Sequence, residues 1–161
     1  MNPKLLHNSN ILELLQAAYI AELQTVEDYL ANSVWLDGPG SRQIAESLDV
    51  YIAQELAHAK RIAIRLKELG VRSPDAFRKE AQRVLPLHDE TDPLIAVEGV
   101  LEAERNAIVR YEKLIEACEG KDIITQDLII AILADEEKHR KVFEDFLNML
   151  SEERKTKPVS L

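Results

Sequence analysis

Cysteine is nearly absent from this sequence, which contains a single thiol, Cys118, among its 161 residues. One cysteine excludes an internal disulfide, a four-cysteine zinc or rubredoxin-type centre and a paired-cysteine redox motif. Turn-forming residues are also scarce, with five glycines and six prolines, and aromatic residues make up only 5% of the chain. The residues that dominate instead are Leu, Ile, Ala, Glu and Lys, which favour helices over strands. The composition therefore predicts an all-α protein.

Positive charge is in short supply as well: 20 basic residues face 29 acidic ones, and the net charge is -9. Such a surface repels nucleic acid and anionic lipid, so cations are the expected small partners. No stretch reaches 18 uncharged apolar residues, and the opening MNPKLLHNSN lacks the apolar run of a signal peptide. We therefore expect a cytoplasmic protein with no membrane or nucleic-acid partner, in keeping with its lack of disulfides.

Four long segments have the apolar spacing of helices with one buried stripe. Short turns at residues 38–40 and at Gly120 separate the segments within two pairs. The interval 71–92 between the pairs is longer, and we expect a short amphipathic helix within it, over residues 75–84. Two hairpins joined by a long crossover predict a single domain over residues 1–161, an antiparallel four-helix bundle. The predicted helices span approximately residues 9–37, 41–69, 93–119 and 122–152.

Two glutamates interrupt the apolar stripes of the first and third helices. Glu22 lies four residues after Ala18, and Glu104 lies four residues after Val100, so both side chains are expected to point into the core. Glu102 cannot share that direction, because two residues of helix turn a side chain by about 200°. A tyrosine follows each glutamate by seven residues, and we expect both phenols to be core aromatics whose hydroxyls contact a carboxylate. These tyrosines are Tyr29 and Tyr111.

A Glu-x-x-His pair interrupts each of the other two stripes. Glu55 and His58 lie on the second helix, and Glu136 and His139 lie on the fourth. Residues three apart project from one face of a helix, so each pair can reach a common point. The first glutamate of a half precedes its pair by 33 residues in one half and by 32 in the other. This matched spacing predicts two half-sites related by a pseudo-twofold axis.

A metal centre is the expected reason for burying four carboxylates. Ionised carboxylates in a helical core are strongly unfavourable unless cations or protons neutralise them. Two divalent ions would neutralise all four charges, and oxygen ligands with two imidazoles suit iron or manganese, with zinc also possible. A single Glu-x-x-His pair is more often a surface pair, so the prediction depends on all six residues lying on inward faces of four helices. The predicted ligands are Glu22, Glu55, His58, Glu104, Glu136 and His139.

The residues beside these candidates are assigned no chemistry. Asp135 and Glu137 flank Glu136, but each is turned by about 100° from it, so we expect both to be solvated. Trp35 lies near the end of the first helix, where we expect a packing or subunit contact.

Around the candidate ligands the sequence resembles bacterioferritins and other ferritin-like di-iron proteins, over residues of all four helices. The matching segments are AELQTVEDYL, QELAHAKRI, AERNAIVRYEKLI and ILADEEKHRKVF. The resemblance implies a ferritin-like fold that binds two iron ions. It implies bridging roles for Glu55 and Glu136. The terminal ligands it implies form two pairs, Glu22 with His58 and Glu104 with His139.

Three departures from the bacterioferritin pattern limit what the resemblance implies. Leu56 occupies the position where haem-binding bacterioferritins have a methionine, so no haem is expected. The residues after the fourth helix, SEERKTKPVSL, are too few and too polar for the fifth helix of 24-subunit cages. The crossover is also longer than in bacterioferritin and is expected to hold a helix, as in the dodecameric Dps mini-ferritins. We therefore expect a homo-oligomer that is a dimer or a dodecamer rather than a 24-mer.

The function that the resemblance implies is that of a di-iron ferroxidase, which oxidises Fe(II) with oxygen or peroxide for iron storage or detoxification. Two alternatives stay open. The same site could belong to a di-iron or di-manganese oxidase, oxygenase or peroxide-scavenging enzyme, or to a non-catalytic helical assembly protein that binds metal structurally. An internal pocket beside the metals would favour the enzyme. Tightly held zinc without oxygen consumption would favour the assembly protein.

Overall fold

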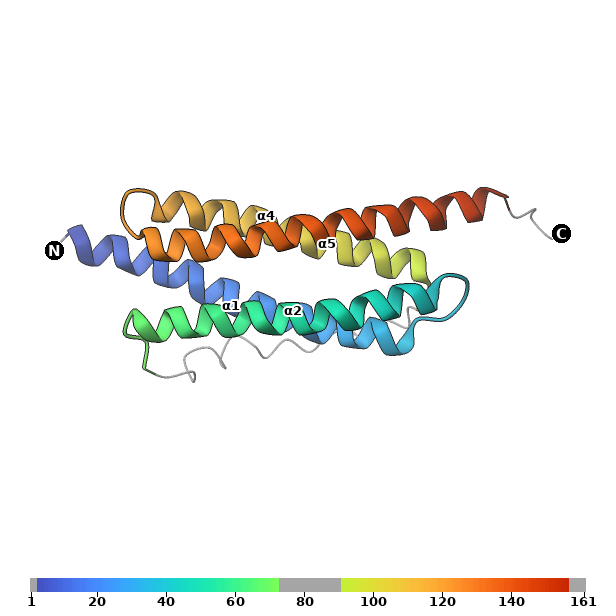
Figure 1. Ribbon diagram of the computed structural model, residues 1–161, viewed down its shortest axis with the longest axis horizontal. Helices are drawn as coiled ribbons and strands as arrows, with labels where there is room; N and C mark the ends of the chain where they lie inside the picture. The colour runs from blue at the N-terminus through green and yellow to red at the C-terminus, as the bar shows by residue number, and fades with distance from the viewer. Residues whose placement is uncertain (1–2, 73–90, 157–161) are drawn as a thin grey trace.

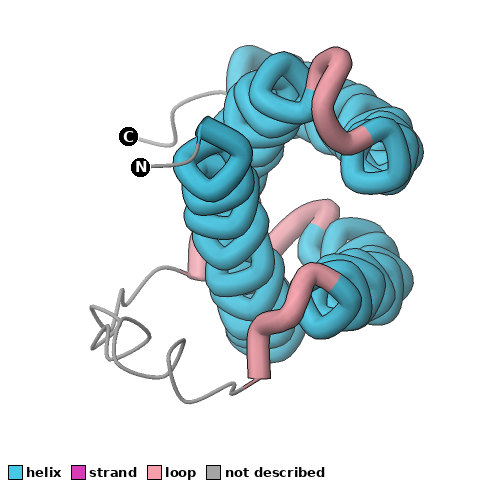
Figure 2. Tube along the Cα trace, turned by 90° about the vertical axis from the view of Figure 1, so that its left-hand side faces the viewer, coloured by secondary structure: helices cyan, strands magenta, loops and turns pink. Residues whose placement is uncertain are grey.

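The computed structural model describes residues 3–72 and 91–156, and within these ranges the chain forms four helices and no strand. The helices form two hairpins, α1 (Pro3–Trp35) with α2 (Ser41–Glu68) and α4 (Pro93–Cys118) with α5 (Ile123–Thr156). Each helix runs antiparallel to its neighbours, and the hairpins meet through α1 against α4 and, less closely, α2 against α5 (Figure 1). Seen along the long axis, the two hairpins face each other (Figure 2). The predicted all-α four-helix bundle is confirmed.

The helix bounds agree with the sequence prediction near the turns and differ at the outer ends. The predicted start of the first helix at residue 9 is wrong, because α1 already begins at Pro3. Proline suits the first turn of a helix, where its missing N–H has no partner to lose. The last helix continues to Thr156 rather than to residue 152, through a run of good helix formers. The short helix predicted over residues 75–84 lies outside the described residues.

An ion-pair network ties the end of α2 to the start of α5. Arg65 of α2 donates from Nη2 to Oδ1 of Asp122 at 2.9 Å and from Nε to Oγ1 of Thr125 at 2.8 Å. Asp122 Oδ1 also accepts the backbone N–H of Thr125 at 3.0 Å, as the capping residue of α5 does. The network fixes the register between the two helices that hold the Glu-x-x-His pairs.

The turn between α1 and α2 requires a glycine at residue 40. Gly40 has a φ of 80°, in the left-handed region that other residues rarely adopt. A Cβ atom at this position would also lie 3.1 Å from Cδ2 of Leu150 on α5. The close approach lets α5 cover the end of the first hairpin.

Two apolar clusters occupy the bundle interior, one on either side of a central polar layer. Fully burying one large apolar side chain contributes roughly 1.5–3 kcal/mol. The Tyr111 cluster comprises Ile11, Leu15, Ala18, Ile62, Leu66, Ala107, Tyr111, Leu114, Cys118, Ile129 and Ile132. The Tyr29 cluster comprises Tyr29, Ile44, Leu48, Val97, Val100, Leu101, Phe143 and Leu150. Along each helix the polar layer falls between them. Over the described ranges, no helix is both long and apolar enough to span a membrane.

Candidate metal centre

Two buried acids reach the polar layer from α1 and α4. Glu22 and Glu104 are both almost completely buried, because each lies one helical turn from a core residue on the inward face. Glu102, two residues before Glu104, is exposed. α4 therefore presents Glu104, and not Glu102, to the bundle interior.

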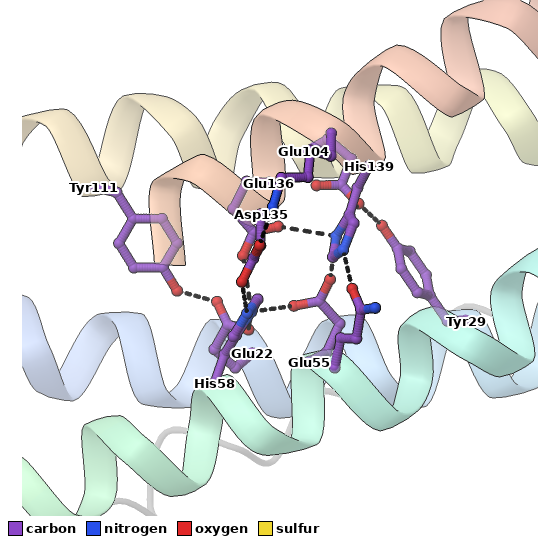
Figure 3. Close-up of polar contacts among 11 residues, drawn as sticks. Glu22, Tyr29, Glu55, His58, Glu104, Tyr111, Asp135, Glu136 and His139 are labelled. Atoms are coloured by element: carbon purple, nitrogen blue, oxygen red, sulfur yellow. Dashed lines mark hydrogen bonds and ion pairs between the residues drawn. The ribbon is translucent and has the colours of Figure 1, made fainter. Parts of the chain in front are cut away.

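The Glu-x-x-His pairs reach the same layer from α2 and α5. Glu55 and His58 are buried, and so are Glu136 and His139. The two pairs point toward each other across the bundle interior (Figure 3). The structure thus brings together all six side chains that the sequence selected.

The six side chains form two overlapping groups, and within each group the ligand atoms lie within 4.8 Å of one another. His58 Nδ1 lies 3.2 Å from Glu55 Oε2 and 3.2 Å from Glu136 Oε1. His139 Nδ1 lies 2.9 Å from Glu55 Oε1 and 3.4 Å from Glu136 Oε2. Glu55 and Glu136 belong to both groups. One group is Glu22, Glu55, His58 and Glu136, and the other is Glu55, Glu104, Glu136 and His139.

Several buried atoms of this layer have no hydrogen-bond partner among the residues that the structure describes. The 2.9 Å approach of His139 Nδ1 to Glu55 Oε1, for example, lacks the alignment of a hydrogen bond. Leaving a buried polar atom unsatisfied costs about 1–3 kcal/mol. Carboxylate oxygens and an imidazole nitrogen that converge in this way fit a divalent cation. The unpartnered atoms are Glu22 Oε2, Glu55 Oε1, Glu136 Oε1 and His139 Nδ1.

Two tyrosines hold the outer acids, each from the opposite hairpin. Tyr29 of α1 donates its hydroxyl to Oε1 of Glu104 on α4. Tyr111 of α4 donates to Oε1 of Glu22 on α1 (Figure 3). Each phenol occupies one oxygen of its carboxylate and so orients the acid within the layer.

Burial sets the protonation of the two outer acids. Desolvation raises the pKa of Glu22 to about 8, against the opposing contact with His58. Desolvation and the nearby charge of Glu136 raise the pKa of Glu104 to about 9, although the bond from Tyr29 opposes the rise. Without a metal, both outer acids therefore hold a proton at pH 7.

In the inner acids and the histidines, contacts with partners of opposite charge outweigh the effect of burial and favour the charged forms. Burial favours the neutral form of Glu55, but contacts with His139 and His58 lower its pKa to about 2. The same histidines lower the pKa of Glu136. Burial also opposes charge on the imidazoles, but the surrounding carboxylates raise the pKa of His58 to about 12 and that of His139 to about 9. The metal-free layer is neutral overall, with two carboxylates, two imidazolium ions and two neutral acids.

Three contacts of the histidines are not foreseen by the sequence pattern. His139 Nε2 lies 2.6 Å from Oε1 of Gln54, and the His139 ring packs against Tyr51 with centroids 4.2 Å apart and the ring planes tilted by 41°. His58 Nε2 lies 3.4 Å from Oδ2 of Asp135. Gln54 and Asp135 each directly precede the glutamate of a Glu-x-x-His pair. A polar residue directly before the glutamate in both Glu-x-x-His pairs is the sequence signal that could have identified Gln54 and Asp135.

The expectation that Asp135 is solvated holds only in part. Its side chain is 35% exposed, but it also lies between His58 and the Nζ atom of Lys138, which is 2.7 Å from Oδ1. The bond from Lys138 is the main cause of a lowered pKa at Asp135. A turn of about 100° from Glu136 brings this side chain to the edge of α2, where one oxygen reaches His58. Glu137, on the other side of Glu136, is exposed as expected.

Other residues of interest lie on the surface. Leu56 is exposed, one position after Glu55, and points away from the polar layer. Trp35 is exposed at the end of α1. The absence of haem and a subunit contact at Trp35 stay predictions.

Comparison with known sequences matches residues 12–152 to the model of the ferritin-like domain. The bacterioferritin of Desulfovibrio desulfuricans is 27% identical over 138 residues, which cover 85% of this chain and 74% of that protein. The DNA protection during starvation protein of Pyrococcus furiosus is 31% identical over 146 residues, which cover 85% of this chain and 76% of that protein.

Solved structures share the same fold. A dodecameric thioferritin, the bacterioferritin-related protein from Bacteroides fragilis, has a TM-score of 0.82 and 24% identity, over 92% of this chain and 90% of that one. A structure of Desulfovibrio desulfuricans bacterioferritin, described with its diiron site in different catalytic states, has a TM-score of 0.78 and 20% identity. It covers 94% of this chain and 86% of that one.

Proposed function

Because this chain belongs to the ferritin-like domain family, we propose that it is a di-iron ferroxidase that oxidises Fe(II) with oxygen or peroxide, for iron storage or detoxification. The observation that carries the proposal is the pair of overlapping buried groups, each with three carboxylates and one imidazole converging on a common space. Relatives described as a bacterioferritin and as a starvation-protection protein support an iron-related role.

The overlap of the two groups supports a division of the ligands. Glu55 and Glu136 belong to both groups, so they are proposed to bridge the two ions. The outer residues belong to one group each and are proposed to be terminal ligands. One terminal pair is Glu22 with His58, and the other is Glu104 with His139.

The donor set supports iron, with manganese or zinc as possible occupants in vitro, because carboxylate oxygens outnumber imidazole nitrogens and no thiolate takes part. Iron supplies one-electron redox chemistry: two Fe(II) substrates give two electrons to oxygen, which takes up two protons to form hydrogen peroxide, or to hydrogen peroxide, which takes up two protons to form two waters. The four carboxylates balance the charge of two divalent ions. Tyr29 and Tyr111 hold the outer acids in place by their hydroxyls.

The proposed assembly is a homo-oligomer, a dimer or a dodecamer rather than a 24-mer. A dodecamer is what the Bacteroides fragilis neighbour is described as forming. The net charge of -9 supports attraction of Fe(II) and disfavours nucleic acid or anionic membrane as a partner. No haem is proposed, because Leu56 offers no ligand. A Soret band after incubation with excess haem would show that this part is wrong.

Native mass spectrometry after anaerobic loading with Fe(II) tests the proposal, since it reports metal count and subunit number together. We expect two irons per chain and oxygen uptake when air is admitted. His58→Ala and His139→Ala should each lose metal and Fe(II) oxidation, whereas the control Glu102→Ala should retain both. Full oxidation activity in either histidine variant would contradict the ligand assignment. Tightly held zinc without any oxygen uptake would contradict the ferroxidase.

A further inference from the structure

The two histidines of the centre differ in what their outer nitrogen contacts. Both Nδ1 atoms face the carboxylates of the centre, which leaves both Nε2 atoms directed away from it. His58 Nε2 lies 3.4 Å from Oδ2 of Asp135 (Figure 3), whereas His139 Nε2 lies 2.6 Å from Oε1 of Gln54. One partner is a carboxylate with a negative charge, and the other is a neutral amide.

Gln54 and Asp135 occupy equivalent positions in the two halves. Each directly precedes a proposed bridging glutamate, and each reaches across from α2 or α5 to the histidine of the other helix. The reciprocal tyrosine bonds to the outer acids repeat between the halves, whereas Tyr51, which lies against His139, has the uncharged Ile132 at the equivalent position. The exchange of an amide for a carboxylate therefore breaks the pseudo-twofold symmetry by one charge.

That charge acts on a bound cation in two ways. A carboxylate that accepts the N–H of a metal-bound imidazole raises the basicity of the ligand, and its own charge attracts the cation. An amide oxygen fixes the orientation and tautomer of the ring but adds no charge. Lys138 pairs with the other oxygen of Asp135 at 2.7 Å and offsets part of the effect. The Lys138 side chain is 73% exposed, however, so water screens its charge more than that of Asp135.

We propose that Asp135 and Gln54 make the two metal positions unequal, so that a divalent cation fills the position of His58 before the position of His139 and binds there more tightly. This inference rests on the two-metal centre of the proposed function. Changing an outer partner of a metal ligand typically alters metal affinity by about 10- to 100-fold, so the two binding steps should differ by roughly that factor. A ferroxidase with this difference retains one ion while the weaker position exchanges iron.

Cobalt(II) is a suitable probe, because it binds the same oxygen and nitrogen ligands and its anomalous X-ray scattering identifies its position. Crystals of the full chain, freed of metal and given one equivalent of Co(II) under argon, should hold most of the cobalt beside His58. Titration calorimetry of the same protein in solution should resolve two binding steps.

Two isosteric substitutions separate the charge from the shape of these side chains. Asp135→Asn should weaken the tighter step by about tenfold or more and leave the weaker step nearly unchanged. Gln54→Glu should strengthen the weaker step, and the double variant should reverse the order of filling. Glu137→Gln is the matched control, since it removes the charge on the other side of Glu136 without touching either imidazole. Melting curves of the metal-free variants verify that each one folds.

The outcomes distinguish the inference from the function on which it rests. Equal filling of the two positions in the parent protein, or an unchanged order in the double variant, overturns the inference and leaves the two-metal centre standing. If the titration ends with fewer than two Co(II) ions bound per chain in this layer, the proposed function is contradicted, and the inference falls with it. A change in Glu137→Gln as large as that in Asp135→Asn also overturns the inference, because the effect would then not pass through the imidazole.

Discussion

The polar layer and the two apolar clusters beside it use the same four helices in opposite ways. In the Tyr29 and Tyr111 clusters, inward positions hold apolar side chains whose burial stabilises the bundle. In the polar layer, the same stripes hold acids and imidazoles, whose burial is unfavourable unless their charges are balanced. The apolar burial that stabilises the bundle and the ligands that bind metal are therefore separated along the bundle axis.

The largest expected effect is the dependence of metal affinity on pH, which arises from titratable groups of the polar layer and from none of the apolar clusters. At pH 7 one proton is held by each of four ligands, namely Glu22, Glu104, His58 and His139. Because metal ligation requires the deprotonated forms, loading two Fe(II) ions should release about four protons per chain. The combined affinity would then change by about four orders of magnitude per pH unit. Anaerobic calorimetry in buffers of different ionisation enthalpy measures the number, and release of one proton or none would contradict this charge balance.

The same protons give a stability test with a definite sign. The pKa values of Glu22 and Glu104 are raised from 4.5, and those of both histidines are raised from 6.5. A raised pKa contributes stability that is present below the unfolded value and is lost as pH rises toward the folded value. The Tm of the metal-free protein should therefore fall between pH 6.5 and 9. In the metal-loaded protein these groups hold no protons, so the Tm should vary much less over that range.

A smaller but still large effect is expected in the apolar clusters, from a matched pair of neighbouring isoleucines. Ile129 is 0% exposed in the Tyr111 cluster, whereas Ile130 is 49% exposed. Ile129→Ala should lower the free energy of unfolding by about 2–5 kcal/mol, because it leaves a cavity. Ile130→Ala should change it by about 0.5 kcal/mol or less. Both variants should still bind two metals per chain when folded. Loss of metal from folded Ile129→Ala would show that the cluster and the polar layer are not separate.

Replacing one outer acid by its amide should weaken metal binding without lowering stability. Glu104→Gln resembles the protonated acid that the metal-free protein already holds, but the amide needs no proton uptake on folding, so at pH 7 its urea unfolding curve should show higher stability than that of the parent. Metal affinity at one position should fall by about 100-fold, or about 3 kcal/mol, because a charged ligand is lost. Glu102→Gln, two residues away and exposed, should leave both quantities nearly unchanged. If Glu102→Gln were the damaging variant, the register of α4 would be wrong.

The smallest effect is expected at the boundary between the two regions, where a cluster residue donates to the polar layer. Tyr29→Phe keeps the apolar ring and removes the hydroxyl that Glu104 accepts. Removing one such hydrogen bond should weaken metal binding by about tenfold or less, and stability by about 1 kcal/mol. Equilibrium dialysis with zinc and urea unfolding measure the two effects. Tyr111→Phe removes the hydroxyl that Glu22 accepts and should have effects of the same size. A large loss of stability in either variant would contradict the separation of apolar clusters and metal ligands along the bundle.

Helical periodicity was sufficient to predict the bundle and the six residues that meet in the polar layer. Side chains that share an inward face can be identified from spacing alone, as Glu104 is by its distance from Val100 and Ile108. Spacing along one helix gives no distance between helices, however. The sequence places Tyr29 seven residues after Glu22, yet its hydroxyl bonds to Glu104.

Asp135 is a second example in which spacing along one helix does not identify the contact with another helix. Its rotation away from Glu136 follows from helical geometry, but whether that direction leads to water or to His58 depends on where α2 lies. The start of α1 was missed for a local reason, because Asn8, Ser9 and Asn10 are good caps in isolation but also continue a helix when the residues before them are helical.

The reciprocal bonds from Tyr29 to Glu104 and from Tyr111 to Glu22 make each hairpin incomplete without the other. The two hairpins repeat their tyrosines and ligands at intervals of 82 or 81 positions along the chain. Two separate copies of one such hairpin, related by a rotation, would satisfy every one of these contacts, so the chain has the architecture of a dimer fused into one polypeptide. A true dimer of identical hairpins would be bound to keep its two halves alike. Fusion removes that constraint, and this chain has glutamine at residue 54 and aspartate at the equivalent residue 135.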